Sequence, residues 1–229
     1  MRPIFVWITI GITDGHAITL LALLYQYQAR WPNDWREIMA GKRLWITGYR
    51  AYELNVFGAQ DPKLKVLKTS LKNTLTQFLD EGLNWLITGG QLGVEQWSIE
   101  VALTLKPLYP EFKIAMMLPF TDFGSQWNDN NKAQLAALRQ QVDFSDAVSQ
   151  APYQKPAQLQ GYTRFMTAHT DAAVIVYDPE FPGKPQWDYR AAEDMANRRD
   201  YPVTLITMDD LQETSEELAE AENEHFQND

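Results

Sequence analysis

The sequence predicts an α/β protein with a doubly wound, mostly parallel sheet. Short apolar runs that resemble strands alternate along the chain with amphipathic segments of helical period. The run Ala172–Tyr177 is apolar at nearly every position, which is typical of a parallel strand covered on both faces. With 229 residues and 45% hydrophobic content, the chain can bury one full core.

Three strands with intervening helices are predicted in the first half of the domain. Arg43–Thr47 is a β-rich run that Gly48 ends, and leucines at steps of three and four make residues 63–81 an amphipathic helix. Gly82 is typical of the glycine that stops a helix. The next predicted elements are a strand at Trp85–Thr88, a helix at 92–105 and a strand at Lys113–Leu118.

The second half continues the same alternation. A polar loop at 121–131 precedes a helix at 132–141. The further predicted elements are a short strand at Phe144–Val148, a Pro/Gln-rich loop at 151–161, a short helix at 162–169, a strand at Ala172–Tyr177, a helix at about 187–199 and a strand at Val203–Thr207. Since right-handed crossovers bring the loops after parallel strands to one edge, we expect ligands to bind there, at the switch point.

Residues 1–38 differ in character from this domain. Ile4–Tyr25 is almost wholly apolar, but Thr13-Asp14-Gly15-His16 interrupts it. A central Asp costs about 3 kcal/mol of insertion free energy, so a transmembrane helix would be marginal. The segment also lacks the basic region and cleavage site of a signal peptide. We therefore expect an upstream extension with Met39 as the natural start, and a membrane contact only if the extension is present and inserted.

The net charge of −10 belongs mainly to the C-terminal end. Residues 209–229 contain nine acidic and no basic side chains, which leaves 21 acidic and 20 basic residues in 1–208. A nearly neutral body lacks the basic surface of a non-specific nucleic-acid binder, so no nucleic-acid partner is expected. We expect residues 212–229 to form a solvated, partly helical acidic tail, with docking on a basic partner as the alternative.

The absence of cysteine and the spacing of the histidines exclude several kinds of site. The chain has no cysteine, and its histidines, His16, His169 and His225, lack ligand spacing. No disulfide, thiolate site or histidine metal site is therefore predicted, and the absence of cysteine fits a cytoplasmic protein. His169 has no partner pattern for catalysis, so a structural role is expected.

The strongest functional signal is the loop Gly89-Gly90-Gln91-Leu92-Gly93, between a predicted strand and a predicted helix. Glycines at such a turn let the backbone approach a ligand, and free N–H groups at the positive end of the helix dipole favour an anion, usually a phosphate. The loop matches neither the dinucleotide fingerprint nor a Walker loop, which argues against a dehydrogenase and an ATPase. A tight structural turn is the alternative.

Several side chains are candidates for the same edge of the sheet. Glu95 is predicted to bond a ribose hydroxyl or to act in acid–base catalysis, with compensation of the helix dipole, worth ~0.3–1 kcal/mol, as the alternative. Arg50 can pair with a phosphate or form a surface salt bridge. Aromatic side chains can stack on a base or pack at the rim. The predicted binding residues are Gly48, Tyr49, Arg50, Gly89, Gly90, Gln91, Gly93, Glu95, Phe120 and Asp178.

Six motifs follow one another in the domain: T-G-Y-R-x-x-E-L (47–54), F-L-D-E-G-L-x-W (78–85), G-Q-L-G-V-E-x-W (90–97), P-F (119–120), Y-D-P-E (177–180) and Y-P-V-x-x-I-T-M-D-D-L (201–211). In this order they resemble the YpsA-type uncharacterised bacterial family of the SLOG superfamily, which includes DprA and LOG proteins. The resemblance covers about Arg43 to Leu211. It implies a single Rossmann-like domain at 42–211 and leaves out residues 1–38 and the far tail.

The resemblance implies a nucleotide-derived ligand at residues 89–95, facing Gly48-Tyr49-Arg50. A nucleotide, NAD or an ADP-ribose-type molecule is the expected class, and no other cofactor is expected. LOG-type phosphoribohydrolases need P-G-G-x-G-T-x-x-E after a later strand, where this chain reads D-P-E-F-P-G-K-P at 178–185. That hydrolysis is therefore not expected.

The leading expectation is a cytoplasmic sensor or regulator that binds such a ligand. The resemblance also implies a connection with cell division, and hence a protein partner; a homo-oligomer is left open. The alternative is an enzyme that cleaves an N-glycosidic or phosphoester bond of the ligand, with Glu95 as the catalytic carboxylate and Asp178 as its helper.

Overall fold

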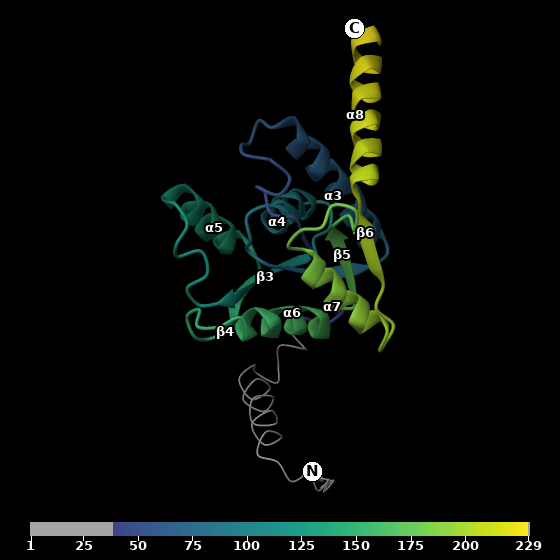
Figure 1. Ribbon diagram of the computed structural model, residues 1–229. Coiled ribbons are helices and arrows are strands. Elements are labelled where there is room, and N and C mark those ends of the chain that lie inside the picture. Colours follow the sequence, from purple (N-terminus) through teal and green to yellow (C-terminus); the bar gives the residue numbers. More distant parts are fainter. Residues whose placement is uncertain (1–38, 229) are drawn as a thin grey trace, which may run out of the picture. The chain divides into compact units, whose positions relative to one another are not determined.

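A computed structural model of the chain describes residues 39–228, with side chains up to residue 224. The sheet has six strands in the order β4-β3-β2-β1-β5-β6, and each neighbouring pair is parallel. The strands are β1 (Lys42–Gly48), β2 (Leu83–Thr88), β3 (Lys113–Phe120), β4 (Phe144–Ser149), β5 (Ala172–Val176) and β6 (Val203–Ile206). This doubly wound, Rossmann-like α/β fold confirms the predicted fold class (Figure 1).

Helices cover both faces of the sheet. Figure 1 shows α3 (Pro62–Asp80) and α4 (Val94–Leu105) on one side of the sheet, and α6 (Ala157–His169) and α7 (Gln186–Ala196) on the other. α5 (Asp129–Gln141) packs beside α4. β1 lies between β2 and β5, and the chain leaves it toward β2 and later returns to β5 on its other side. The topological switch point therefore lies between β1 and β5.

The central strands are buried because their apolar side chains face helices on both sides of the sheet. Leu44, Trp45 and Ile46 of β1 have no exposed surface. Two threonines end the apolar runs of β1 and β2, and both are buried. Thr88 donates a hydrogen bond to the Ile46 carbonyl over 2.6 Å. The hydroxyl of Thr47 instead bonds to a carboxylate in the site described below.

The helix predicted at 63–81 is present as α3, with boundaries one residue earlier. Asp61 caps its first turn by accepting a hydrogen bond from the Lys63 N–H over 3.0 Å, and Pro62 occupies the start, where a missing N–H costs nothing. Gly82 follows with φ of 88°, in the region that favours glycine. The leucine stripe is buried, as its helical spacing predicts.

Two predicted loops contribute residues to helices. The loop at 121–131 was predicted from its asparagines, but Asn128 caps α5 by accepting from the Asn131 N–H, so the helix begins at Asp129 instead of 132. The loop at 151–161 ends early because α6 begins at Ala157. The Gln158 side chain accepts bonds from the N–H groups of residues 154 and 155, which fixes the chain before that helix.

The acidic tail is one helix, α8 (Met208–Asn228). It begins inside the predicted domain of residues 42–211 and runs through the predicted boundary without a break. α8 packs against α3, and Thr214 is buried there. Lys65 of α3 forms an ion pair with Glu222 of α8. At least the first half of the predicted tail is therefore part of the folded structure.

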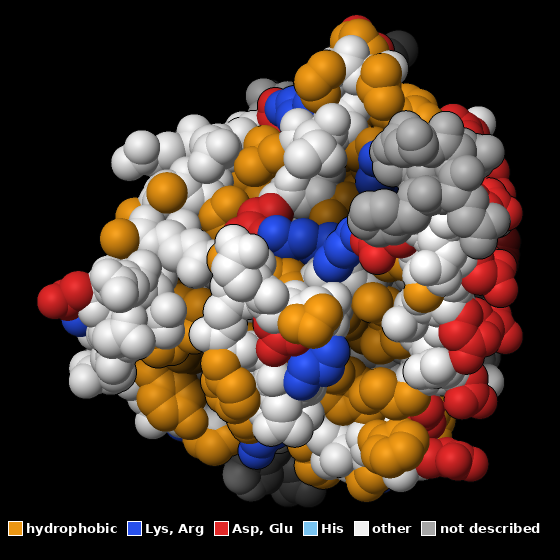
Figure 2. Space-filling view, turned by 90° about the horizontal axis from the view of Figure 1, so that it is seen from above, with side chains coloured by type: hydrophobic (Ala, Val, Ile, Leu, Met, Phe, Trp, Pro, Cys, Tyr) orange, Lys and Arg blue, Asp and Glu red, His pale blue; other side chains and the backbone are white. Residues whose placement is uncertain are grey.

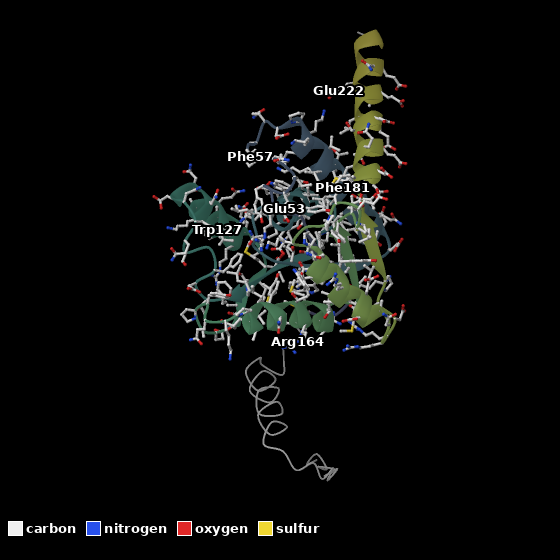
Figure 3. All side chains as sticks on the ribbon, in the orientation of Figure 1. Glu53, Phe57, Trp127, Arg164, Phe181 and Glu222 are labelled. Atoms are coloured by element: carbon white, nitrogen blue, oxygen red, sulfur yellow. The ribbon has the colours of Figure 1, made fainter. Side chains whose placement is uncertain are left out.

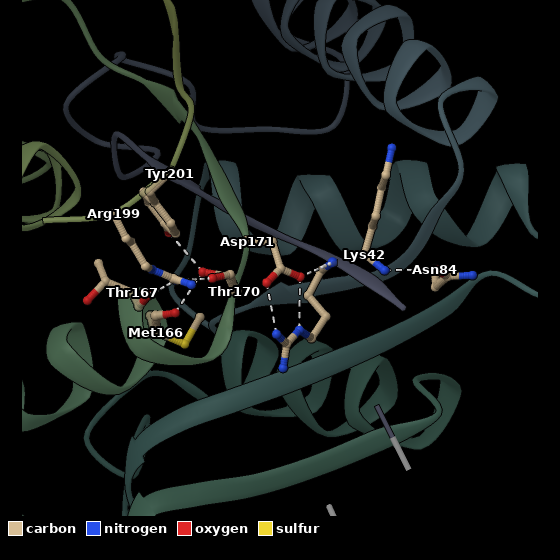
Figure 4. Close-up of polar contacts among 9 residues, drawn as sticks. Lys42, Asn84, Met166, Thr167, Thr170, Asp171, Arg199 and Tyr201 are labelled. Atoms are coloured by element: carbon tan, nitrogen blue, oxygen red, sulfur yellow. Dashed lines mark hydrogen bonds and ion pairs between the residues drawn. The ribbon is translucent and has the colours of Figure 1, made fainter. Parts of the chain in front are cut away.

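A cluster of polar contacts ties the amino-terminal edge of the sheet together (Figure 4). Arg43 donates two guanidinium bonds to Asp171, at 3.0 and 2.8 Å, and its backbone N–H donates a third at 2.9 Å. Arg199 donates to the backbone carbonyls of Thr167 and Thr170, and its guanidinium lies 5.0 Å from the ring centroid of Tyr201. These contacts join the first residues of β1 and β5 to the ends of α6 and α7.

Within the described residues, no helix is both long enough and apolar enough to cross a membrane. The predictions for residues 1–38 lie outside the described part of the chain.

Candidate functional site

The candidate site lies at the carboxyl ends of β1, β2 and β5. Figure 2 views the molecule from the side toward which β5 points in Figure 1. Lys and Arg side chains lie among apolar and polar ones near the middle of this face, and acidic side chains gather on the side where α8 lies.

The glycine loop after β2 is held against the turn after β1. Arg50 and Gly93 form an isolated bridge, in which the Ala51 N–H donates to the Leu92 carbonyl at 3.1 Å and the Val94 N–H to the Tyr49 carbonyl at 3.2 Å. Gly93 has φ of 117°, and a Cβ on it would lie 2.5 Å from the Ala51 nitrogen. Only glycine fits this position without strain. The two turns that the sequence places at this edge are therefore in direct contact.

The other glycines of the site also pack against the protein. A Cβ on Gly48 would lie 2.7 Å from the Val176 carbonyl, and one on Gly90 would lie 2.7 Å from a Leu118 methyl group. The close packing at each position therefore explains why the residue is a glycine, as the alternative of a tight structural turn predicts. This packing concerns the space for a side chain and does not involve the backbone N–H groups.

Three backbone N–H groups of the glycine loop have no hydrogen-bond acceptor among the described residues; they belong to Gly90, Leu92 and Gly93. Gln91 differs, because its N–H donates to the Glu95 side chain at 2.8 Å. The three N–H groups lie at the start of α4, where the helix dipole is positive. Such groups can bind an anion through the backbone alone.

Glu95 is buried at the first turn of α4 and is 8% exposed. Its Oε1 accepts from the Thr47 hydroxyl at 3.0 Å, and its Oε2 accepts from the Gln91 N–H. Burial raises the pKa of Glu95, although the Gln91 and Thr47 hydrogen bonds and the charge of Arg50 act in the opposite direction. Glu95 thus lies under the glycine loop as a carboxyl group that holds its proton more strongly than usual.

Asp188 of α7 is a second acidic group at the same place. It is half-buried and accepts from the Thr163 hydroxyl at 3.2 Å. Burial and then the neighbouring Glu95 raise the pKa of Asp188 to about 7, while Thr163, Arg50 and Thr47 lower it. Two carboxyl groups from helices on opposite faces of the sheet therefore interact electrostatically near the end of β1.

Tyr162 of α6 completes this group of side chains. Its hydroxyl is buried and has no hydrogen-bond partner among the residues that the structure describes. A Cβ on Gly89 would lie 2.5 Å from this hydroxyl and 2.1 Å from the Glu95 Oε2, so both side chains converge on the volume that Gly89 leaves free. Burial, and then the charges of Glu95 and Asp188, raise the pKa of Tyr162. An unpartnered buried hydroxyl is uncommon in native structures, and this one is free to bond a water or a ligand that enters the site.

Arg50 supplies the positive charge of the site. Its backbone N–H donates to the Glu53 carboxylate at 2.9 Å, but its half-buried guanidinium forms no hydrogen bond or ion pair with a described residue. The charge of Arg50 nevertheless lowers the pKa of both Glu95 and Asp188. The guanidinium is thus close to the carboxyl pair and available for an incoming anion.

Tyr49 and Phe120, which the sequence leaves open between stacking on a base and packing at the rim, both pack against the protein. Tyr49 is 3% exposed, and its hydroxyl bonds to the backbone of Asp178 and Phe181. Phe120 packs against Phe123 and Tyr153, with ring centroids 5.6 and 5.1 Å apart. Exposed aromatic side chains near this edge, which the sequence interpretation missed, include Tyr52 and Phe57 after β1, Phe181 after β5 and Trp187 in the first turn of α7.

Asp178 has both carboxylate oxygens in backbone contacts. Oδ1 accepts from the Glu180 N–H at 2.8 Å and Oδ2 from the Met208 N–H at 3.2 Å, so Asp178 fixes its own loop and the start of α8. Glu53 joins this loop to the turn after β1, because its second oxygen accepts from the Lys184 N–H at 2.7 Å. Figure 3 shows Glu53 near Phe181 at the same end of the molecule.

Sequence reasoning missed Thr47, Tyr162, Thr163 and Asp188. One signal for Asp188 was present, since it occupies the first turn of the helix after β5 as Glu95 occupies the first turn of the helix after β2. His169, which was expected to be structural, stacks on Phe165 with ring centroids 4.0 Å apart, and its Nδ1 lies 2.7 Å from the Phe165 carbonyl oxygen.

Fold and site together define a Rossmann-like α/β protein in which a glycine loop at the start of a helix lies beside a buried carboxyl group. The family model described as the YspA SLOG family (YpsA) matches residues 44–211. The chain therefore belongs to the YpsA family of SLOG proteins.

Bacterial relatives agree with this assignment. The chain is 83% identical over 191 residues to a UPF0398 protein of Lacticaseibacillus casei, which covers 83% of this chain and all of the relative. It is 56% identical over 184 residues to a UPF0398 protein of Lactiplantibacillus plantarum, covering 80% and 97% of the two chains. A UPF0398 protein of Leuconostoc citreum is 54% identical over 187 residues, covering 81% and 99%.

Proposed function

We propose that the protein binds a phosphate-bearing nucleotide or nucleotide-derived ligand at the carboxyl edge of its sheet and acts in the cytoplasm as a sensor or regulator. One observation carries the proposal: three unbonded N–H groups at the start of α4 lie in a loop that is bridged to Arg50, whose guanidinium has no partner among the described residues. N–H groups, a helix dipole and a guanidinium together are the groups that proteins use for phosphate.

The family supports a nucleotide as the source of that phosphate, because SLOG proteins are associated with nucleotide-related ligands. Exposed aromatic side chains nearby, such as Phe181 in the loop after β5 and Trp187 at the start of α7, offer flat surfaces for a base. The links to cell division and to a protein partner stay predictions from the resemblance.

A second candidate function is hydrolysis of an N-glycosidic or phosphoester bond of the ligand, with Glu95 as the catalytic carboxylate. It is favoured by the raised pKa of Glu95 beside a second carboxyl group, which suits general acid catalysis. We propose Asp188 as the assisting carboxyl group in place of Asp178, whose two carboxylate oxygens accept from backbone N–H groups.

Calorimetric titration with AMP, NAD and ADP-ribose, with product analysis of each mixture, tests both functions. We expect at least one compound to bind, and Arg50→Ala to weaken its affinity about tenfold or more, as loss of a charge-assisted phosphate contact predicts. Arg164→Ala is the matched control, since Arg164 is exposed on α6 and lies away from Glu53 and Phe181 in Figure 3.

Each result has a defined meaning. If none of the three compounds binds, or if Arg50→Ala and Arg164→Ala bind equally well, the proposed anion site is wrong. If a compound is turned over and Glu95→Gln abolishes turnover while keeping affinity, the hydrolase replaces the sensor.

A further inference from the structure

Two side chains from opposite faces of the sheet converge beside Gly89, the residue that follows β2. Glu95 comes from α4 and Tyr162 from α6. A Cβ placed on Gly89 would lie 2.1 Å from the Glu95 Oε2 and 2.5 Å from the Tyr162 hydroxyl oxygen. The two oxygens therefore lie within about 5 Å of each other, and no hydrogen bond joins them. This separation suits a single oxygen atom that bonds to both.

The hydrogen-bonding capacity of the two groups decides what can lie between them. The Tyr162 hydroxyl has a hydrogen to donate and no partner among the described residues. The Glu95 Oε2 accepts from the Gln91 N–H at 2.8 Å, which leaves this oxygen a second lone pair. A bridging oxygen must therefore accept from Tyr162 and donate to Glu95. A hydroxyl group does both, whereas an ionised phosphate oxygen or a carbonyl oxygen can only accept.

Burial makes the match strict. Glu95 and Tyr162 are each only 8% exposed, so water does not freely replace a missing hydrogen bond at this place. A ligand that brings a hydroxyl satisfies a donor and an acceptor, while a ligand without one leaves both buried groups short of a partner. The next residue, Gly90, has one of the unbonded N–H groups that suit an anion. A place for a hydroxyl and a place for a phosphate are thus adjacent along the loop.

We propose that Tyr162 and Glu95 form a subsite for a sugar hydroxyl, and that the ligand is a ribonucleotide whose phosphate binds the N–H groups of Gly90, Leu92 and Gly93. The inference rests on the proposed function, because it places the phosphate at the same N–H groups. It adds Tyr162 to the site as a residue that determines specificity. It also predicts that the protein distinguishes a ribonucleotide from an analogue without the sugar hydroxyls.

Calorimetric titration of the full chain with AMP and with dideoxy-AMP tests the subsite, because the two probes differ only in the two ribose hydroxyls. We expect the wild type to bind AMP about tenfold or more tightly than dideoxy-AMP. Tyr162→Phe removes the hydroxyl and keeps the ring, so it should weaken AMP binding several-fold and leave dideoxy-AMP binding unchanged. Tyr201→Phe is the matched control, since its buried hydroxyl bonds to Thr170 at the amino-terminal edge of the sheet. This variant should keep the wild-type preference for AMP.

The outcomes separate the two proposals. If the wild type binds AMP and dideoxy-AMP equally well, the hydroxyl subsite is wrong and the proposed function stands. If Tyr162→Phe weakens both probes by the same factor, Tyr162 acts on the shape of the site and not on the sugar, which also overturns the subsite. If the wild type binds neither probe, the subsite and the proposed function both fail for this class of ligand.

Discussion

At the scale of single residues, the site depends on the positions of backbone N–H groups and side-chain hydroxyl groups, which the sequence does not show directly. The glycine loop and Glu95 could be located, because a strand, three glycines and a helix start follow one another in the sequence. Asp188 could not be paired with Glu95, since the two residues are far apart and interact only through the crossover of the fold. The sequence left Tyr49 open between stacking on a base and packing, because an aromatic side chain at a strand end can face either solvent or the interior. In the structure its hydroxyl bonds to a neighbouring loop.

Gly93→Ala tests the bridge between the two turns. Its φ of 117° and the approach of the Ala51 nitrogen leave no room for a Cβ. We expect a loss of about 1–3 kcal/mol in the free energy of unfolding, measured by urea denaturation. Gly58→Ala is the control, because a Cβ there would meet nothing within 4 Å. Equal stabilities for the two variants would contradict this account of Gly93.

Tyr162→Phe tests whether the unpartnered hydroxyl serves a ligand. Removing a buried hydroxyl without a partner leaves stability unchanged or raises it by up to about 1 kcal/mol. Affinity for ADP-ribose is expected to fall several-fold at the same time, since a donor to the ligand is lost. A clear loss of stability without any change in affinity would show that the hydroxyl has a structural role.

At the scale of helices and strands, alternation of apolar runs and leucine spacing was sufficient to predict the order of elements, but helix starts were less predictable. The polar residues before α5 and α6 suggest loops by composition, yet Asn128 and Gln158 use their side chains to bond the backbone at the helix start. The same residue types favour loops and caps for one physical reason, because their side chains compete for backbone groups.

Asp61→Ala tests the cap of α3. Its side chain accepts from the Lys63 N–H, and we expect its loss to cost about 1 kcal/mol in the free energy of unfolding. The control is Glu222→Gln, which removes an ion pair between two exposed side chains and is expected to change stability by less than about 0.5 kcal/mol. Chemical denaturation measures the free energy of unfolding of both variants. A larger loss for Glu222→Gln than for Asp61→Ala would contradict the importance of the cap.

The ion pair between Arg43 and Asp171 at the amino-terminal edge of the sheet predicts an acid-sensitive contribution to the free energy of unfolding. Burial raises the pKa of Asp171, but its hydrogen bonds and ion pair with Arg43 outweigh burial and lower the pKa overall. The stabilisation is therefore present above the unfolded pKa, near 4, and is lost as the pH falls through the lower folded value. Asp171→Asn should cost roughly 1 kcal/mol at pH 7 and less at about pH 3. A cost independent of pH would exclude this ion pair as its cause.

At the scale of the whole molecule, the boundary between domain and tail decides how the charge is arranged. Composition separates a nearly neutral body from an acidic end, and the extent of the family resemblance predicted the domain boundary at residue 211. The structure has one helix across this position, with Thr214 buried and Leu218 half-buried against the body, while the acidic side chains occupy its exposed positions. Charge therefore follows the exposed face of α8 and does not mark the end of the folded unit.

Truncation after Leu211 tests this arrangement. The shortened chain loses the buried contacts of α8 with α3, and we expect the free energy of unfolding to fall by roughly 1–3 kcal/mol. For a chain of this size each kcal/mol lowers Tm by about 2–4 °C, which calorimetry resolves. Truncation after Glu220 keeps Thr214 and Leu218 and should change Tm little, although it too removes acidic residues. If both truncations lower Tm equally, charge and not packing explains the effect, and the folded unit ends near residue 211.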